Sequence, residues 1–564
     1  MKFIIMKKTF FFKSSIVFAA QLLLSSCGLD LMVSKFNTLE YTVTPTQVEV
    51  HGGVIDIELD VNIPKKYFQK NASAEFRPML AESADSDNKV FFEPVKLQGE
   101  KVSSNGKTIG YVTGGKFTYK GSLEYTEDMF AYDLFATATA TMNDNSKYLG
   151  SLKIADGIMA TATRVKNNEE PKFADHTYEK ETILEETAVI YFTVNNSTVR
   201  YSQKSSDEVK RLKEFAKQGF KTKNIEISSY ASPEGSLDVN DKVSGNRAKS
   251  TFSYAKRLMR DLKVDGAKND DLYINSSKGE DWGGFNNLVN SSDLKDKSKV
   301  LNIVRNQKDP QKREEAIRDM AEIYDAIEDD VLPKLRKATI TLRVYEPKKT
   351  DEEIASLAIS DPSQLDMKEM LFAATLLNDN SIKKTIYKAT TSAYPNDYRA
   401  YNNLLCMNII EKDFNKAKMN LGKAEKLGAS AKEVSENKGI MAAISGDLEG
   451  ANSLYSKSGA SDLNKGILAI KMGDYNSASS KLKVNGYNAT LAQILNGNNA
   501  TTIDKTADGY YLNAISSTRS GNFDNAVQNL SQAISLDANL SKEAAKDVEF
   551  IKLRDNLEFQ SLVK

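Results

Sequence analysis

Apolar and polar residues alternate with a period of two between Asn37 and about Arg164. The alternation is clearest over residues 54–61, VIDIELDV. Shorter runs of the same kind recur near residues 90–95, 117–119, 134–141 and 149–154. Glycine pairs and asparagine-rich stretches separate these runs, as turns separate strands. The pattern predicts seven or eight strands and therefore a β-sandwich over residues 27–165.

The hydrophobic period changes after a polar stretch. Residues 166–186, which contain Pro171, are predicted to form a linker. Beyond it, the pattern predicts strands at 188–194, 225–229 and 339–344 and helices at 206–218 and 241–262. This strand–helix–strand–helix order, closed by a last strand, is typical of an α/β sandwich over residues 187–347. A helical insertion is expected at about 265–335.

A short motif recurs four times in the last part of the chain. It reads EKDFNKA at 411–417, SGDLEGA at 445–451, MGDYNSA at 472–478 and SGNFDNA at 520–526. The first two copies are 34 residues apart, the tetratricopeptide (TPR) period, whereas the next spacings are 27 and 48. We therefore predict an all-α, TPR-like solenoid over residues 348–564, with one shortened and one interrupted unit. Such solenoids usually bind peptides or partner proteins on their concave face.

Composition excludes several functions for this multidomain α+β chain. Its 564 residues include 76 basic and 76 acidic ones, so the charge balance does not favour nucleic acid. The two histidines, His51 and His176, lie far apart, and with two cysteines no metal site can be assembled by spacing. Phosphate-binding loops and nucleophile elbows do not occur. We expect neither an enzyme nor a cofactor.

The N-terminus is typical of a targeting segment. Four lysines in the first 13 residues precede an apolar run, 14–24, that is too short to remain as a spanning helix. The run leads into LSSC, which resembles a bacterial lipobox, so residues 1–26 would be removed and Cys27 would carry lipid. We expect attachment to the outer membrane on its periplasmic side, with the cell surface as the alternative. Cys406 then stands alone and is predicted to be an inert core residue.

One segment carries a more specific signal. Residues 225–248 read IEISSYASPEGSLDVNDKVSGNRA, a strand that enters a Pro-Glu-Gly turn and then a helix. The segment resembles the signature of the OmpA-like domain, which attaches envelope proteins to peptidoglycan. That signature, D-x-x-G-x-x-x-x-N-x-x-L-S-x-x-R-A, is matched in register at Gly235, Asn240, Ser244, Arg247 and Ala248.

The resemblance implies a site for diaminopimelate-type peptidoglycan with a weakened clamp. In the family, the aspartate takes the ammonium and the arginine takes the carboxylate of diaminopimelate. Here Ser232 replaces the aspartate, Glu234 is another source of negative charge, and one lost charge-assisted partner costs about 1.5–3 kcal/mol. The candidate binding residues are Tyr230, Ser232, Glu234, Asn240 and Arg247. The alternative is an OmpA-like fold used as a scaffold, with Arg247 pairing inside the domain.

The predicted insertion contains the chain's only tryptophan, in GEDWGG at residues 279–284. This pattern resembles extended OmpA-like variants of Bacteroidota envelope proteins. In one interpretation, Trp282 anchors packing and Asp281 caps a helix. In the other, Glu280 and Asp281 line a ligand groove.

Two functional hypotheses follow. In the first, a lipoprotein tethers or scaffolds between the outer membrane, peptidoglycan and a protein partner bound by the TPR-like domain. In the second, the chain is an accessory subunit of an envelope machine for outer-membrane protein assembly, secretion or fimbrial assembly, and no longer binds peptidoglycan. Ser232 and the size of the flanking domains favour the second. A wall hydrolase is disfavoured, because no paired-carboxylate or histidine-centred motif occurs.

Overall fold

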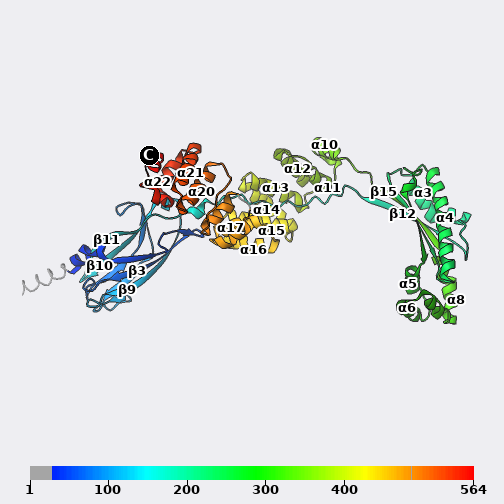
Figure 1. Cartoon of the computed structure of the whole chain (residues 1–564), viewed down its shortest axis with the longest axis horizontal. Coiled ribbons are helices and arrows are strands. Elements are labelled where there is room, and N and C mark those ends of the chain that lie inside the picture. Colours follow the sequence, from blue (N-terminus) through cyan, green and yellow to red (C-terminus); the bar gives the residue numbers. More distant parts are fainter. Residues whose placement is uncertain (1–27, 484–485) are drawn as a thin grey trace, which may run out of the picture. The chain divides into compact units, whose positions relative to one another are not determined.

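The structure, a computed structural model, describes residues 28–483 and 486–564. The predicted signal segment and Cys27 lie outside the described residues. The chain divides into two compact units (Figure 1). Unit 1 joins the part up to Asp175 with Tyr387–Lys564, and unit 2 is His176–Ile386. Within the described part, no helix is long and apolar enough to cross a membrane.

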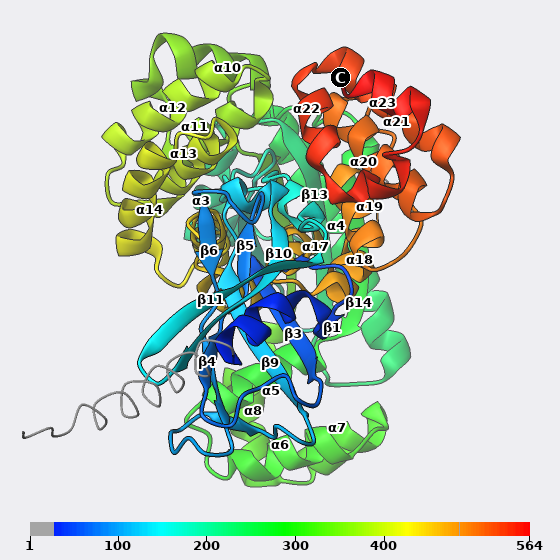
Figure 2. The same ribbon diagram turned by 90° about the vertical axis from the view of Figure 1, so that its left-hand side faces the viewer.

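Unit 1 begins with a β-rich region in which two sheets share one core. Its strands are β1 (Glu40–Thr44), β2 (Val50–His51), β3 (Val54–Ile63), β4 (Ser73–Phe76), β5 (Met79–Ala81), β6 (Lys89–Phe91), β7 (Val95–Gly99), β8 (Lys107–Ile109), β9 (Gly115–Glu124), β10 (Asp133–Met142) and β11 (Asn145–Ala155). One sheet has the order β1-β3-β2, with β9 paired to β3. Strands β1, β3 and β9 are labelled in Figure 2. The other has the order β6-β5-β10-β4-β7-β8, with β11 paired to β10. Both sheets contribute side chains to one hydrophobic cluster.

Period-two alternation determines which side chains enter this core. In β3, Ile55, Ile57, Leu59 and Val61 are buried, and the residues between them are not. The structure confirms the strand-rich region, but eleven strands occur among its described residues instead of seven or eight. The difference arises because β2, β5, β6 and β8 have only two or three residues each, too few for a period to be recognised.

Unit 2 is built on a four-stranded sheet in the order β12-β15-β13-β14. Its main elements are β12 (Ile183–Tyr191), α2 (Tyr201–Lys204), α3 (Asp207–Ala216), β13 (Thr222–Ala231), α4 (Leu237–Asp261), β14 (Tyr273–Glu280) and β15 (Lys337–Tyr345). Strand β14 pairs in parallel with β13, so the segment that the sequence assigned to the insertion is a strand of the sheet. The sequence YINSSKGE did not predict a strand, because only Tyr273 is fully buried and apolar and polar residues therefore do not alternate.

The insertion proper is a small helical body with its own apolar cluster. It consists of α5 (Trp282–Ser291), α6 (Lys297–Asn306), α7 (Pro310–Arg318), α8 (Ala321–Asp330) and α9 (Leu332–Leu335). Asp281 Oδ1 accepts a hydrogen bond from Gly284 N at 2.7 Å, and the rings of Trp282 and Phe285 pack edge to face at 5.5 Å. These contacts confirm that Asp281 is a helix N-cap and that Trp282 is a packing anchor. Helices α10 (Asp351–Ser360) and α11 (Met367–Leu376) complete unit 2.

Unit 1 resumes within α12 and continues as paired helices. They are α12 (Asn380–Ala393), α13 (Tyr398–Ile410), α14 (Phe414–Gly428), α15 (Lys432–Ile444), α16 (Leu448–Ser458), α17 (Asp462–Lys471), α18 (Tyr475–Lys481), α19 (Tyr487–Leu495), α20 (Ala507–Arg519), α21 (Phe523–Leu536), α22 (Asn539–Lys546) and α23 (Leu557–Leu562). The recurring motif lies at the turn inside a pair. Its Asp or Asn caps the second helix, at Asp413, Asp447, Asp474 and Asn522.

The motif alanines explain why these helices pack closely. Ala417, Ala451, Ala478 and Ala526 are fully buried, each on the second helix of a pair. This geometry confirms the predicted TPR-like solenoid. Two features accompany the irregular spacings of the motif. Helix α18 is only seven residues long, and α19 followed by a non-helical stretch separates it from α20.

A buried ionic cluster joins the β-rich region to the C-terminal helices within unit 1. The Arg164 guanidinium lies 4.0 Å from the ring centroid of Tyr511 and contacts the carboxylates of Glu543 and Asp547. Asp547, 2% exposed, also accepts a hydrogen bond from Tyr511 Oη at 2.9 Å. Burial raises the pKa of the Asp547 carboxyl, and Arg164 opposes that shift. Arg164 is therefore the cation that pairs with this buried carboxyl group and opposes the rise in its pKa.

Candidate functional sites

The candidate peptidoglycan residues lie where β13 ends and α4 begins. Tyr230 is the second-last residue of β13, and Ser232 and Glu234 are in the loop that follows. Asn240 and Arg247 are on α4. Gly235 has φ +117°, a backbone conformation that favours glycine and allows the loop to turn into the helix. The structure thus brings all five residues to one end of the sheet.

Arg247 is buried and points into the unit. Its side chain is 2% exposed, and its three donor nitrogens each bond a backbone carbonyl. Nε donates to Asn196 O at 3.0 Å, Nη1 to Tyr230 O at 2.9 Å and Nη2 to Thr193 O at 3.2 Å. Burial and the neighbouring Arg336 lower the pKa of Arg247 to about 10. Its guanidinium therefore ties the ends of β12 and β13 to α4.

Glu234 is held by a second arginine. Arg336 Nε and Nη2 donate to its two carboxylate oxygens at 2.8 and 2.7 Å, a bidentate pair. Ser232 Oγ donates to the same carboxylate at 2.8 Å. The Glu234 carboxylate, the alternative source of negative charge at this site, is thus already paired inside the unit.

Contacts from the insertion and from strands β14 and β15 surround the rest of this site. Glu314 on α7 accepts a hydrogen bond from Gly235 N at 2.6 Å, and burial raises the pKa of its carboxyl. Asn240 Nδ2 donates to Glu280 Oε1 at 2.8 Å. Lys337 Nζ lies 5.3 Å from the ring centroid of Tyr230. With Arg247 2% exposed, a peptide stem reaches its guanidinium only if the surrounding groups move.

A second site, which sequence reasoning missed, lies on the solenoid. Residues 166–174, within the predicted linker, run without regular secondary structure past the helices of the pairs, after a tight turn in which Asn168 N donates to Lys166 O at 3.0 Å (Figure 1). Four asparagines each bond both the N–H and the C=O of one residue in this segment. These pairs are Asn488 with Lys166 (2.9 and 2.8 Å), Asn464 with Glu170 (2.9 and 2.9 Å), Asn437 with Lys172 (2.8 and 2.8 Å) and Asn403 with Ala174 (2.7 and 3.3 Å). We call residues 166–174 the bound segment and these four asparagines the asparagine face.

Charged side chains of the bound segment have partners on the same helices. Glu169 pairs with Lys471 at 2.8 Å, with side chains 3% and 12% exposed. Lys172 lies 3.4 Å from the buried Glu436. Lys166 lies 3.4 Å from Asp504 and 3.2 Å from Asp508. Backbone bonding and charge pairing therefore act together along the segment.

Cys406 lies beneath this segment. It is fully buried, as the sequence predicted, and burial raises the pKa of its thiol. Its Sγ donates to Lys172 O at 3.2 Å and accepts from Asn437 Nδ2 at 3.2 Å. The thiol is therefore covered by the bound segment as well as by neighbouring helices.

The sequence contains a signal for the asparagine face. Asn403, Asn437 and Asn464 each stand fourteen residues before the motif alanines Ala417, Ala451 and Ala478. Asparagine inside a helix is unfavourable in isolation, so its recurrence at one offset indicates a role outside the helix. Asn513, on α20, bonds Thr502 N and O in the same way, at 2.8 and 3.1 Å.

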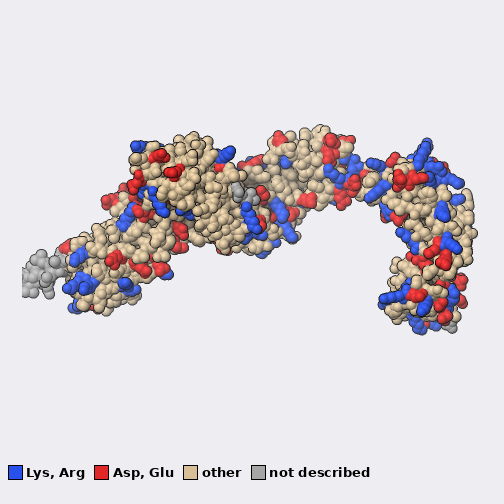
Figure 3. Space-filling view, in the orientation of Figure 1, with Lys and Arg blue, Asp and Glu red and all other residues tan. Residues whose placement is uncertain are grey.

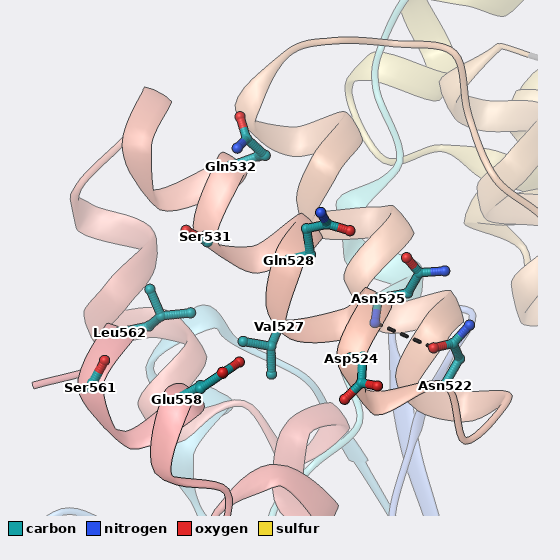
Figure 4. Close-up of a pocket in the computed structure, with 10 residues that line it drawn as sticks. All are labelled: Asn522, Asp524, Asn525, Val527, Gln528, Ser531, Gln532, Glu558, Ser561 and Leu562. Atoms are coloured by element: carbon teal, nitrogen blue, oxygen red, sulfur yellow. Dashed lines mark hydrogen bonds between the residues drawn. The ribbon is translucent and has the colours of Figure 1, made fainter.

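A surface pocket of about 660 Å³ lies between α21 and α23 (Figure 4). Amide and hydroxyl side chains such as Asn522, Gln528 and Ser531 line most of it, with Val527 and Leu562 as apolar contributions. The carboxylates of Asp524 and Glu558 also line it. Among the described residues, no group of three or more His, Cys, Asp and Glu could hold a metal ion. Basic and acidic side chains are interspersed on the visible surface (Figure 3).

Comparisons with known proteins give distant matches only. No family model and no curated protein matches the chain. Among solved TPR-repeat structures, the Cut9–Hcn1 hetero-tetramer of APC/C matches at 13% identity and a TM-score of 0.23, over 58% of this chain and 76% of that one. Yeast Tom70 matches at 14% identity and a TM-score of 0.19, over 57% and 76%. The TPR-like assignment rests on the repeat geometry described above.

Proposed function

We propose that this protein is a non-enzymatic scaffold of a bacterial outer membrane, anchored by lipid on Cys27. In this proposal, the OmpA-like unit is a structural module, and the TPR-like solenoid serves a protein partner within an envelope complex. The observation that carries it is the closed state of the candidate wall site. Arg247 is bonded to three carbonyls, and Glu234 is held by Arg336. This supports the accessory-subunit hypothesis over an open wall clamp.

Peptidoglycan binding is the second candidate function. The register of Gly235, Asn240, Ser244 and Arg247 with the OmpA-like signature favours it. Binding would require Arg336 to release Glu234 and the Gly235–Glu314 hydrogen bond to open. Breaking such charge-assisted contacts weakens affinity about tenfold for each 1.4 kcal/mol.

Sedimentation with diaminopimelate-type sacculi separates the two functions. We expect the acyl-free protein, Gly28 onward, to stay in the supernatant, because both halves of the clamp are engaged internally. Ser232→Asp restores the family's carboxylate, and we expect it to increase sedimentation if that residue alone limits binding. Wild-type sedimentation that free diaminopimelate abolishes would contradict the scaffold proposal and establish the wall tether.

The lipid anchor is tested by membrane fractionation. We expect Cys27→Ser to move the protein from the outer-membrane fraction to the soluble fraction, because no acyl chain can then be attached. Cys406→Ser is the matched control and should stay with the membrane. Leu29 and Met32 are 1% and 0% exposed in the β-rich core, so the proposed anchor would hold that region at the bilayer surface. Membrane retention of Cys27→Ser would contradict the proposal.

A further inference from the structure

We propose that the asparagine face is a binding site for an extended polypeptide and that the chain's own bound segment occupies it. The site excludes other polypeptides while this intramolecular ligand is in place. This inference uses only contacts within unit 1 and depends on neither the lipid anchor nor the cell wall.

The asparagine face binds mainly backbone, and Asn488 Nδ2 also donates to the Asn168 side chain at 2.7 Å. A carboxamide that accepts an N–H and donates to the C=O of the same residue makes the pair of bonds that a neighbouring β-strand would make. Four such pairs recur at Lys166, Glu170, Lys172 and Ala174. Because each pair requires only a backbone N–H and C=O, the site can hold any extended segment without proline at those positions.

The sequence of the bound segment fits this mode of recognition. Pro171, which has no N–H, falls between the bonded residues Glu170 and Lys172, where no asparagine requires a donor. Proline also biases the residue before it towards extended backbone, so Glu170 is preorganised for binding. The segment therefore loses less conformational freedom on binding than a glycine-rich linker would.

Charge pairs determine the register. The side chains of Lys166, Glu169 and Lys172 alternate in sign along the segment, and each meets the opposite charge on the solenoid. A shift of the segment along the face would bring like charges together. The backbone bonds thus supply general affinity, and the charge pairs select this chain's own segment.

Covalent connection makes the intramolecular ligand hard to displace. A segment tethered by a short flexible chain competes at an effective concentration in the millimolar range. A free peptide of the same sequence should therefore bind only when the resident segment has been weakened.

The test uses the acyl-free chain from Gly28, in which Cys406 is the sole cysteine, and a synthetic peptide of residues 166–175. Glu169→Lys combined with Lys172→Glu reverses two register charges without changing the solenoid. We expect thiol labelling of Cys406 to become at least about tenfold faster, because the cover over Sγ opens more often. The peptide should bind the variant and slow the labelling again, and it should not bind wild type.

The controls isolate the backbone contacts. A peptide N-methylated at Glu170 and Lys172 lacks two of the bonded donors and should not bind. Lys426→Glu combined with Glu449→Lys reverses two exposed charges elsewhere on the solenoid and should leave labelling unchanged. Unchanged labelling of the segment variant, or equal binding of both peptides, would overturn the proposal.

A measurement on the wild-type protein tests the proposal even if the charge-reversed variant does not fold. Amide hydrogen exchange at Lys166, Glu170, Lys172 and Ala174 should be as slow as in the buried solenoid helices. Exchange at the rate of an exposed linker would likewise overturn the proposal.

Discussion

Arg247→Ala should destabilise unit 2 by about 3–5 kcal/mol rather than remove only a ligand contact. The substitution removes the arginine donors from the carbonyls of Thr193, Asn196 and Tyr230, of which Thr193 O keeps only its bond from Asn196 N. It also opens a cavity beside Phe192, over which the guanidinium lies at 5.2 Å. Trp282 is the chain's only tryptophan, so its fluorescence during urea unfolding reports on unit 2 alone. We expect a clear fall in the unfolding midpoint.

Arg257→Ala is the matched control, because Arg257 is exposed on the same helix. It should move the midpoint little. An unchanged midpoint for Arg247→Ala would show that the guanidinium can leave its carbonyls at little cost and is free to bind a ligand. The expected destabilisation also means that loss of sacculus binding in Arg247→Ala could not by itself identify a wall contact.

Arg164→Met should destabilise unit 1 by about 3–5 kcal/mol, because it leaves the Asp547 carboxylate buried without its cation. Methionine keeps much of the apolar volume, so the loss is mainly electrostatic. Thermal unfolding followed by circular dichroism should show a lower transition for unit 1, while Trp282 fluorescence is unchanged. Lys546→Met, which removes an exposed pair with Glu82, should cost about 0–1 kcal/mol. Equal effects of the two substitutions would contradict this role of Arg164.

The loss of unfolding free energy caused by Arg164→Met should depend on pH. Without the guanidinium, the folded-state pKa of Asp547 rises further above its unfolded value, so the folded variant binds a proton more readily than the unfolded chain. Stability of the variant relative to wild type is then recovered as pH falls through that pKa and is lost as pH rises. We expect a smaller deficit at about pH 5 than at about pH 8. A deficit that is constant over this range would indicate a packing defect instead.

Regular patterns in the sequence predicted the main architecture. The alternation in residues 54–61 and the recurring Ala417 and Ala451 correspond to β3 and to the helix pairs. Strand β14 was missed because a polar strand at the edge of a sheet has no buried face to produce alternation. Short strands such as β5 were missed because their length is below one period.

The sites were less predictable than the fold. The sequence placed Arg247 and Glu234 at one end of the sheet, but it could not show that Arg336, about a hundred residues later, would hold Glu234. The sequence predicted a linker at the bound segment, because every residue except proline can make these backbone hydrogen bonds and the residue types therefore do not reveal them. Only Asn403, Asn437 and Asn464, at a constant offset from the motif alanines, carry that information in the sequence, and Asn488 does not share the offset.

The position of the bound segment in the chain constrains the order of folding. Lys166 and Ala174 find their asparagine partners 322 and 229 residues later, and all of unit 2 lies between them. During synthesis, this segment leaves the ribosome long before the helices that bind it. Unit 2 is thus able to fold first, as an independent insertion. The first half of unit 1 must wait with this segment exposed, and the entropic cost of closing the loop rises only logarithmically with its length, by about 0.6 kcal/mol per doubling. A chaperone that covers extended, charged polypeptide would have its longest opportunity at this stage.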